Sequence, residues 1–200
     1  MSKVKWIIFD VSGVLTKFTF TNSEGYRVGN KFFASKKLEA IYFSDEYRDY
    51  MLGKISHVTF INNFIRMNNL DLNVEEFNSL FENDLKPMDG MKELISSLRK
   101  NYKIALASNE GEALSKLRIE KSGVSEYISK IIISYKIKEL KPSLNFFKKA
   151  LEILDAKSKE CVFIDDDSKN VESARSLGIY SILFKDRAGL LAEIKKLNLV

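Results

Sequence analysis

The sequence contains very little cysteine, histidine, tryptophan or proline. Cys161 is the one cysteine, His57 the one histidine, and there are two prolines among 200 residues. A lone cysteine excludes an intramolecular disulfide and argues against a disulfide-stapled secreted protein. The two prolines and nine glycines leave little room for a long flexible linker. We therefore expect a folded protein of a reducing compartment, the cytoplasm.

Long apolar runs and a one-sided charge pattern are also lacking. The first residues lead directly into a short apolar run, so we expect neither an export signal nor a membrane partner. The net charge of +5 comes from lysines scattered along polar helix faces, for example at Lys36-Lys37, Lys148-Lys149 and Lys195-Lys196. Because no basic stripe alternates with aromatic residues, we expect no nucleic-acid partner. The hydrophobic share of 45% is ordinary for a globular chain.

Short apolar runs, each too short for a buried helix, recur along the chain and predict strands. They lie at Val4–Phe9, Ile104–Ala107, Ile131–Ile133, Val162–Ile164 and Ser181–Phe184. Both faces of each run are apolar, and segments with helical spacing separate them, as in Met91, Leu94, Ile95 and Leu98. This pattern predicts an α/β fold, a three-layer Rossmann-like parallel sheet with helices on both faces.

The segment between Phe9 and Ile104 is far longer than an ordinary crossover, which predicts an insertion. We expect a catalytic core at 1–16 plus 88–200, and a flap with a small α-helical cap at 17–87. Weak alternation from Phe18 to Val28 around Asn22–Gly25 predicts a hairpin flap. Four further apolar stripes predict about four cap helices: Leu38/Ile41/Tyr42, Tyr47/Tyr50/Met51, Val58/Ile61/Phe64/Ile65 and Phe77/Leu80/Phe81.

Polar side chains stand where several expected strands end. Asp10 follows the first strand, Ser108-Asn109 the second, and Asp165-Asp166-Asp167 the fourth, while Lys141-Pro142 precedes a helix. Each feature alone has a plain structural explanation, such as a helix cap, a turn or a solvated lysine. Together they indicate a site, because ligands of open α/β sheets bind at the carboxyl ends of the strands.

These four features, in this order, resemble the motifs of the haloacid dehalogenase-like (HAD) hydrolase superfamily, in its helical-cap branch. The resemblance spans nearly the whole chain. It includes the run from Phe163 to Ile179, which is similar to the fourth motif of the family, and Leu52–Ser56 in the cap. It implies that the five core strands lie in the order 5-4-1-2-3, with Asp10 and Asp166 facing one cleft.

The resemblance also implies a chemistry. Asp10 is then the nucleophile that forms an aspartyl-phosphate, and Mg²⁺ is held by Asp10, the backbone carbonyl of Ser12 and Asp166, with Asp165 beside the ion or in its second shell. Lys141 neutralises nucleophile and phosphoryl group, while the Ser108 hydroxyl and the Asn109 N–H donate to phosphate oxygens. The expected enzyme is a Mg²⁺-dependent phosphatase of a small phosphorylated metabolite.

Ser12 departs from the pattern of most phosphatases of this family, which carry an aspartate two residues after the nucleophile. A serine hydroxyl does not ionise near neutrality and cannot replace a carboxylic acid as proton donor. A phosphatase for good leaving groups, or one with another donor such as Asp167, is one interpretation, and we favour it. Phosphonate or C-halogen hydrolysis is a second, with Lys31, Lys36, Lys37 and Lys54 available in the cap for the former. A catalytically weak phosphate- or metal-binding module is a third.

The remaining cap residues give no readable substrate pattern. His57 is a candidate proton donor, but beside Val58 on an apolar helix a structural histidine is the commoner outcome. The cap aromatics are likewise more often core than substrate contacts; they are Phe32, Phe33, Tyr42, Phe43, Tyr47 and Tyr50. Substrate identity therefore stays open at this stage.

Overall fold

The computed structural model describes residues 4–199; residues 1–3 and 200, which belong to the predicted core, lie outside the described range. The main sheet has five parallel strands in the order β5-β4-β1-β6-β7. The strands are β1 (Trp6–Phe9), β4 (Lys103–Ser108), β5 (Lys130–Ile133), β6 (Cys161–Asp165) and β7 (Tyr180–Leu183). Along the chain, β1, β4, β5, β6 and β7 are the first to fifth core strands. Listed from the β7 edge, the sheet therefore has the order 5-4-1-2-3, and the predicted order is confirmed.

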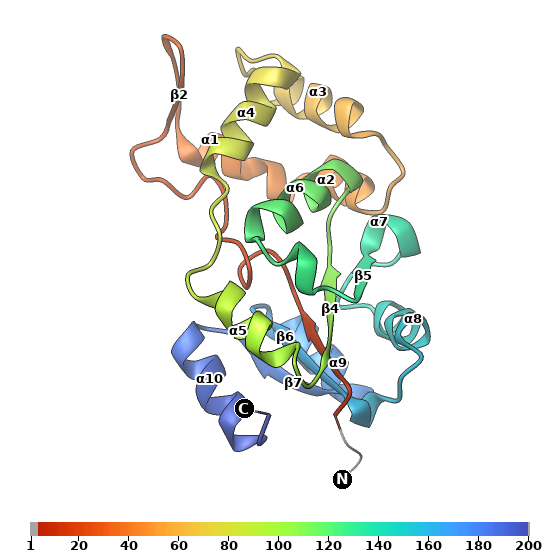
Figure 1. Ribbon diagram of the computed structural model, residues 1–200. Helices are drawn as coiled ribbons and strands as arrows, with labels where there is room; N and C mark the ends of the chain where they lie inside the picture. The colour runs from red at the N-terminus through yellow and green to blue at the C-terminus, as the bar shows by residue number, and fades with distance from the viewer. Residues whose placement is uncertain (1–3, 200) are drawn as a thin grey trace.

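Helices cover both faces of the sheet, and alternate residues of each strand are therefore buried against opposite layers (Figure 1). Ile7 and Phe9 of β1 pack with α5 (Met91–Leu98) and α10 (Arg187–Lys196) on one face. Trp6 and Ile8 pack with α8 (Leu144–Leu154) and α9 (Ser168–Ser176) on the other. The predicted three-layer α/β architecture is therefore confirmed.

A helical segment with its own apolar core lies beyond the carboxyl ends of the strands (Figure 1). It contains α1 (Ser35–Glu39), η1 (Ala40–Phe43), α2 (Asp45–Met51), α3 (His57–Met67) and α4 (Val74–Asp84). We call residues 17–87 the cap; these boundaries stay a prediction. The two chain connections to the cap run side by side, since Lys17 N donates to Lys86 O at 2.9 Å and Met88 N to Leu15 O at 2.8 Å.

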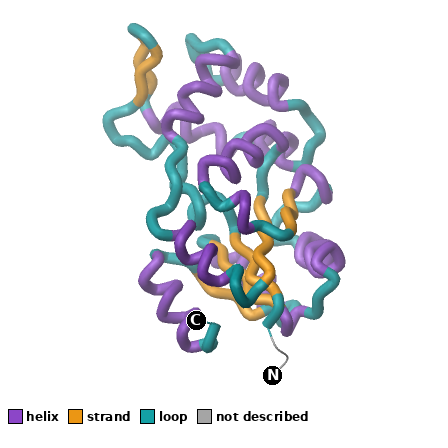
Figure 2. Tube along the Cα trace, in the orientation of Figure 1, coloured by secondary structure: helices purple, strands orange, loops and turns teal. Residues whose placement is uncertain are grey.

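The hairpin of the flap differs from its prediction. Its strands are β2 (Tyr26–Val28) and β3 (Lys31–Phe33), which stand apart from the main sheet in Figure 2. The predicted hairpin from Phe18 to Val28 is therefore wrong: Asn22–Gly25 forms a turn that leads into β2. The hairpin turn is Gly29-Asn30, where Gly29 adopts φ 57°. Gly29 supplies the left-handed backbone that a tight hairpin turn needs.

The structure also contains elements that no apolar stripe announced. The helix α6 (Glu112–Ser122) follows β4, and its buried side includes Ser115, Arg118 and Ser122. Shorter elements are η2 (Ser125–Tyr127), α7 (Ser134–Ile137) and η3 (Ser158–Glu160). Within residues 4–199, no helix has the length and apolar character needed to cross a membrane.

Candidate active site

Asp10 stands at the point where β1 leaves the sheet. Its backbone N–H donates to Ile164 O of β6 at 2.9 Å, which continues the strand pairing by one residue. The residue is 7% exposed, so its carboxylate is largely shielded from bulk water. Its position at the carboxyl edge of β1, between β4 and β6, is the usual location of ligand sites in such sheets.

Three carboxylates meet at this edge. Asp10, Asp165 and Asp166 each offer an oxygen, and these oxygens lie within 4.8 Å of one another. Asp165 is fully buried at the end of β6, and its Oδ1 accepts the backbone N–H of Asp167 at 2.9 Å. Like charges at this separation repel strongly where water is scarce, so the cluster requires nearby positive charge.

Lys141 supplies part of that charge. Its Nζ lies 2.9 Å from Asp10 Oδ1 and 2.6 Å from Asp165 Oδ2, and it also donates to Ala107 O at 2.8 Å. The side chain is 1% exposed. Burial alone would lower the pKa of Lys141, but the carboxylates of Asp10 and Asp165 outweigh it and raise that pKa. The lysine is therefore a fixed cation between two carboxylates.

The charge of Lys141 does not balance the cluster. Burial, supported by repulsion from Asp165, raises the pKa of Asp10 to about 7 in spite of the adjacent lysine. Burial and the neighbouring Asp165 likewise raise the pKa of Asp166 to about 6. The pKa values of both carboxyls thus lie well above the usual range of aspartate, as expected for a site that has more negative than positive charge.

A hard divalent cation fits this arrangement. Carboxylate and amide oxygens are the donors that Mg²⁺ prefers, and a double charge would offset the excess negative charge. Among the described residues, Asn170 Oδ1 is buried without a hydrogen-bond partner, while its Nδ2 donates to Asp165 Oδ1 at 3.0 Å. An unsatisfied buried oxygen beside a carboxylate cluster is a further feature that a bound cation or its water would satisfy.

Ser108 and Asn109 end β4 next to Lys141. Ser108 is 3% exposed, and the Asn109 side chain forms a closed pair with the Lys141 backbone. In that pair, Asn109 Nδ2 donates to Lys141 O and Lys141 N donates to Asn109 Oδ1, both at 2.8 Å. The end of β4 and the segment that carries the lysine are therefore held in one fixed relation.

The turn after Asp10 brings Gly13 against the acidic cluster. Gly13 adopts φ +81°, and a Cβ there would lie 2.4 Å from Asp166 Oδ2. Glycine is therefore needed twice, for the left-handed backbone and for the close approach. Ser12, the preceding residue, is half-buried and forms a bridge with Thr16 across the same turn.

The other candidate residues lie elsewhere. Both ring nitrogens of His57 have partners in hydrogen-bond range, Tyr50 Oη at 3.2 Å and Asn78 Oδ1 at 2.9 Å, which suits a structural histidine. Cap lysines form local pairs: Lys31 with Glu76 at 3.2 Å and Lys54 with Asp49 at 2.7 Å. Of the cap aromatics, Phe33, Tyr47 and Tyr50 are buried, and Phe32 and Phe43 are exposed.

Two sets of residues near the site were not among the predicted site residues. Asn170 lies in the first turn of α9, five positions after Asp165. A polar residue in the first helical turn after a strand lies near the end of that strand, and this spacing could have identified Asn170. Glu110 and Arg118 form a buried ion pair, Nε to Oε2 3.0 Å, directly after the Ser108-Asn109 segment. No sequence spacing announces this pair, because its members lie eight positions apart, one in the loop after β4 and the other on α6.

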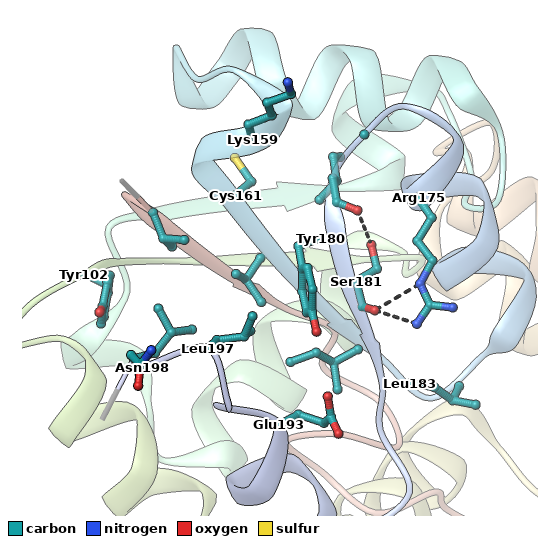
Figure 3. Close-up of a pocket in the computed structure, with 16 residues that line it drawn as sticks. Tyr102, Lys159, Cys161, Arg175, Tyr180, Ser181, Leu183, Glu193, Leu197 and Asn198 are labelled. Carbon is teal, nitrogen blue, oxygen red and sulfur yellow. Dashed lines mark hydrogen bonds between the residues drawn. The ribbon is translucent and has the colours of Figure 1, made fainter. Parts of the chain in front are cut away.

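A separate hollow of about 1260 Å³ lies along the β7 edge of the sheet (Figure 3). It is lined by Tyr102, Cys161 and Tyr180, at or before the starts of their strands, and so lies away from the acidic cluster. Its Arg175 donates from Nε and Nη2 to Ser181 O at 3.1 and 2.7 Å. This guanidinium is used to cover an edge-strand carbonyl, and none of the predicted site residues lines the hollow.

Fold and site together define an α/β enzyme whose functional groups gather where parallel strands end. The sequence model of haloacid dehalogenase-like hydrolases matches residues 7–184 of the chain. The chain therefore belongs to this family, as the motifs indicated, and it is a hydrolase. Solved structures agree in fold: an HAD-like family hydrolase from Porphyromonas gingivalis superposes with a TM-score of 0.77 at 22% identity, covering 98% of both chains.

An HAD family enzyme from Bacteroides thetaiotaomicron, whose crystal structure holds magnesium and inorganic phosphate, has a TM-score of 0.75 at 22% identity over 92% of this chain and 96% of that one. Pyrimidine 5′-nucleotidase YjjG of Escherichia coli is 28% identical over 75% of this chain and 71% of its own length. Bifunctional epoxide hydrolase 2 of Rattus norvegicus is 32% identical over 46% of this chain, but only 16% of the rat protein is matched. Phosphatases are also among the relatives, for example the phosphorylated carbohydrates phosphatase of Thermotoga maritima, 30% identical over 54% of this chain and 50% of its own length.

Proposed function

We propose that this chain is a Mg²⁺-dependent phosphatase of a small phosphorylated metabolite, with Asp10 as nucleophile. The observation that carries the proposal is the contact of Lys141 Nζ with both Asp10 and Asp165, beside Asp166, at the carboxyl edge of the sheet. A carboxylate and a phosphate ester repel each other, and this arrangement places cationic charge where the two must meet.

In the proposed reaction, a carboxylate oxygen of Asp10 attacks phosphorus and the bond from phosphorus to the ester oxygen breaks, which leaves an aspartyl-phosphate. Lys141 offsets charge on the nucleophile and on the transferring group. In this proposal, the Ser108 hydroxyl and the Asn109 backbone N–H donate to the phosphate oxygens. Water then hydrolyses the acyl phosphate, which releases inorganic phosphate and restores Asp10.

Asp10, Asp166 and the backbone carbonyl of Ser12 would hold Mg²⁺, with Asp165 in the surrounding shell because its oxygens already accept from Lys141, Asp167 and Asn170. When bound, Mg²⁺ supplies a hard Lewis acid that polarises the phosphoryl group and allows two anions to approach. Ser12 offers no carboxylic proton to the departing oxygen. The proposed enzyme therefore favours esters of acidic alcohols, whose oxygen leaves without protonation.

The test measures phosphate release from a panel of phosphoesters with increasing leaving-group pKa, with and without Mg²⁺. The native chain is compared with Asp10→Asn and with Asp186→Asn, which alters the exposed N-cap of α10 and serves as control. We expect turnover that requires Mg²⁺ and Asp10 and is retained in Asp186→Asn. Turnover that survives in Asp10→Asn, or silence across the panel, would refute the proposal.

A further inference from the structure

The loop that follows β4 is held from the cap as well as from the core. We call residues 108–111 the phosphate loop, and this inference rests on the proposed function of Ser108 and Asn109. We propose that Glu110 is a positioning residue through which the cap helix α2 sets the phosphate loop. Glu110 is 1% exposed, and its carboxylate has partners from both parts of the molecule.

The contacts of the Glu110 carboxylate join three segments. From the cap, the Tyr47 hydroxyl of α2 donates to Oε1 and Oε2 at 3.1 and 3.2 Å. From the core, Arg118 Nε of α6 donates to Oε2 at 3.0 Å. From the loop itself, Gly111 N donates to Oε1 at 3.1 Å. The carboxylate is therefore a junction between α2, α6 and the backbone of the phosphate loop.

The backbone of the loop is tied to α2 by a second route. Glu110 N donates to Ser134 Oγ at 3.0 Å, and that oxygen also lies 2.7 Å from Met51 O, at the end of α2. On the adjoining turn of α6, the Tyr50 hydroxyl accepts the Leu114 N–H at 3.2 Å. Side chain and backbone of Glu110 thus both lead to the same short cap helix.

Close packing reinforces these bonds. A Cβ on Gly111 would lie 2.1 Å from the Tyr50 ring, so glycine at this position allows α2 to rest directly on the loop backbone. Arg118 is enclosed by the cap as well: its Nη2 donates to the Tyr42 hydroxyl at 3.3 Å, and its guanidinium lies 4.9 Å from the centre of the Phe81 ring. Cap side chains therefore cover the guanidinium of an ion pair whose two members both belong to the core.

The opposite end of the loop is fixed to the catalytic lysine. Asn109 is bonded in both directions to the Lys141 backbone, and Lys141 Nζ contacts Asp10. Asn109 and Glu110 are adjacent residues, so a shift of α2 acts on the phosphate donors within one peptide unit. Because all Glu110 oxygens are bonded to Tyr47, Arg118 and Gly111, the carboxylate acts through the loop rather than on the substrate.

A buried ion pair is weak evidence for stability, because desolvation offsets most of its attraction. In this junction the pair contributes conformational specificity instead, because each bonded atom must keep its position. The bonds of the Glu110 carboxylate itself reach neither Asp10 nor Asp166, the proposed Mg²⁺ ligands; the route from Glu110 to Asp10 passes through Asn109 and Lys141. Loosening the junction is therefore expected to weaken phosphate binding without weakening Mg²⁺ binding.

The experiment removes one hydroxyl from the junction with Tyr47→Phe. Tyr26→Phe is the matched control, because the Tyr26 hydroxyl also donates to a carboxylate, Asp84 Oδ2 at 2.8 Å, but inside the cap and away from the loop. Calorimetry measures the affinity for Mg²⁺ alone and then for inorganic phosphate at saturating Mg²⁺. Kinetics give kcat and KM for p-nitrophenyl phosphate, and circular dichroism checks that each variant is folded at the assay temperature.

We expect Tyr47→Phe to weaken phosphate binding and to lower kcat/KM by about fivefold, the effect of one lost hydrogen bond. Its Mg²⁺ affinity should stay within about twofold of the native value, because Tyr47 and Glu110 contact neither Asp10 nor Asp166 directly. Glu110→Gln, which keeps the shape and removes the charge, should act in the same direction and more strongly. Tyr26→Phe should match the native protein in all three quantities.

Two results would overturn the inference in distinguishable ways. A native protein that binds Mg²⁺ but neither binds phosphate nor turns over any ester refutes the proposed function, and the inference with it. A native protein that binds phosphate, with Tyr47→Phe indistinguishable from Tyr26→Phe, leaves the function standing and refutes the inference. Equal losses of Mg²⁺ and phosphate affinity in Tyr47→Phe would also refute it, because that is the result of general unfolding.

Discussion

Ser12 is the residue whose chemistry differs most from that of the usual phosphatases of the family. It sits two positions after Asp10 in a tight turn, half-buried. General acid catalysis contributes about 10²–10⁴-fold when the leaving group needs a proton. We predict that Ser12→Asp raises kcat for alkyl phosphates by about 10²-fold and for p-nitrophenyl phosphate by much less. The measurement is the slope of log kcat against leaving-group pKa, which should become shallower.

Two further variants separate the possible proton sources. Ser12→Ala should leave the slope of the native protein unchanged, because the hydroxyl does not serve as an acid. Asp167→Asn keeps the cap of α9, since asparagine also caps helices, and removes the nearby carboxyl. If the slope steepens in Asp167→Asn, Asp167 is the donor. A slope that Ser12→Asp does not change would contradict the prediction.

At the scale of single elements, the turn between β1 and the cap controls the acidic cluster. An alanine at Gly13 would be strained at φ +81° and would lie 2.4 Å from Asp166 Oδ2. The left-handed backbone costs a residue with a Cβ about 1–2 kcal/mol. We predict that Gly13→Ala is destabilised by at least that amount and also displaces Asp166, with a loss of Mg²⁺ affinity. Chemical denaturation and metal calorimetry measure the two effects.

Gly29→Ala is the matched control for this substitution. Gly29 has φ +57°, and a Cβ there would meet no atom within 4 Å. Its replacement therefore costs only backbone strain, in a hairpin remote from the carboxylates. Unchanged Mg²⁺ affinity is expected for Gly29→Ala, and the interpretation of Gly13 fails if the two variants bind Mg²⁺ equally well.

The sequence predicts helices and strands whose buried side is apolar, and it does not predict those whose buried side carries polar residues. The core strands were readable because each contains a run of apolar, buried residues: all four of β1, Ile104–Ala107 of β4 and Cys161–Ile164 of β6. The helix α6 lacked a recognisable stripe because Ser115, Arg118 and Ser122 occupy its buried side. The hairpin was misplaced because the Asn22–Gly25 turn precedes the Gly29-Asn30 turn that joins the strands.

The candidate site divides in the same way. Asp10, Asp165 and Asp166 could be placed together because the carboxyl ends of parallel strands share one edge, whereas Lys141, which precedes a helix, joined them only through the resemblance to the family motifs. The Glu110 junction could not, because its partner Tyr47 is 63 positions away in sequence and meets it only when the cap is docked. Local sequence patterns predict where a residue lies within a helix or strand. A contact between the cap and the core depends instead on how these two parts pack together.

At the scale of the whole molecule, the acidic cluster links stability to pH and to Mg²⁺. The pKa of Asp10 is raised from 3.8 to about 7, and that of Asp166 from 3.8 to about 6. Between about pH 4 and about pH 7, the folded chain therefore binds more protons at these two carboxyls than the unfolded chain does. Without metal, the free energy of unfolding contributed by these groups is therefore greatest at low pH and falls as the pH rises from about 4 to 7.

Under the proposed ligation Mg²⁺ should reverse this trend, because it would bind the deprotonated carboxylates that destabilise the metal-free protein. At a concentration one hundred times its dissociation constant, a ligand stabilises a fold by about 2.7 kcal/mol, which raises the Tm of a chain of this size by about 5–10 °C. We predict a rise of that order at pH 8 and little or none at pH 5, where protons compete for Asp10 and Asp166. Thermal unfolding with and without Mg²⁺ at the two pH values measures it. In Asp10→Asn the Tm without metal should be less sensitive to pH and the response to Mg²⁺ smaller; an equal Mg²⁺ effect at both pH values would contradict the proposed ligation.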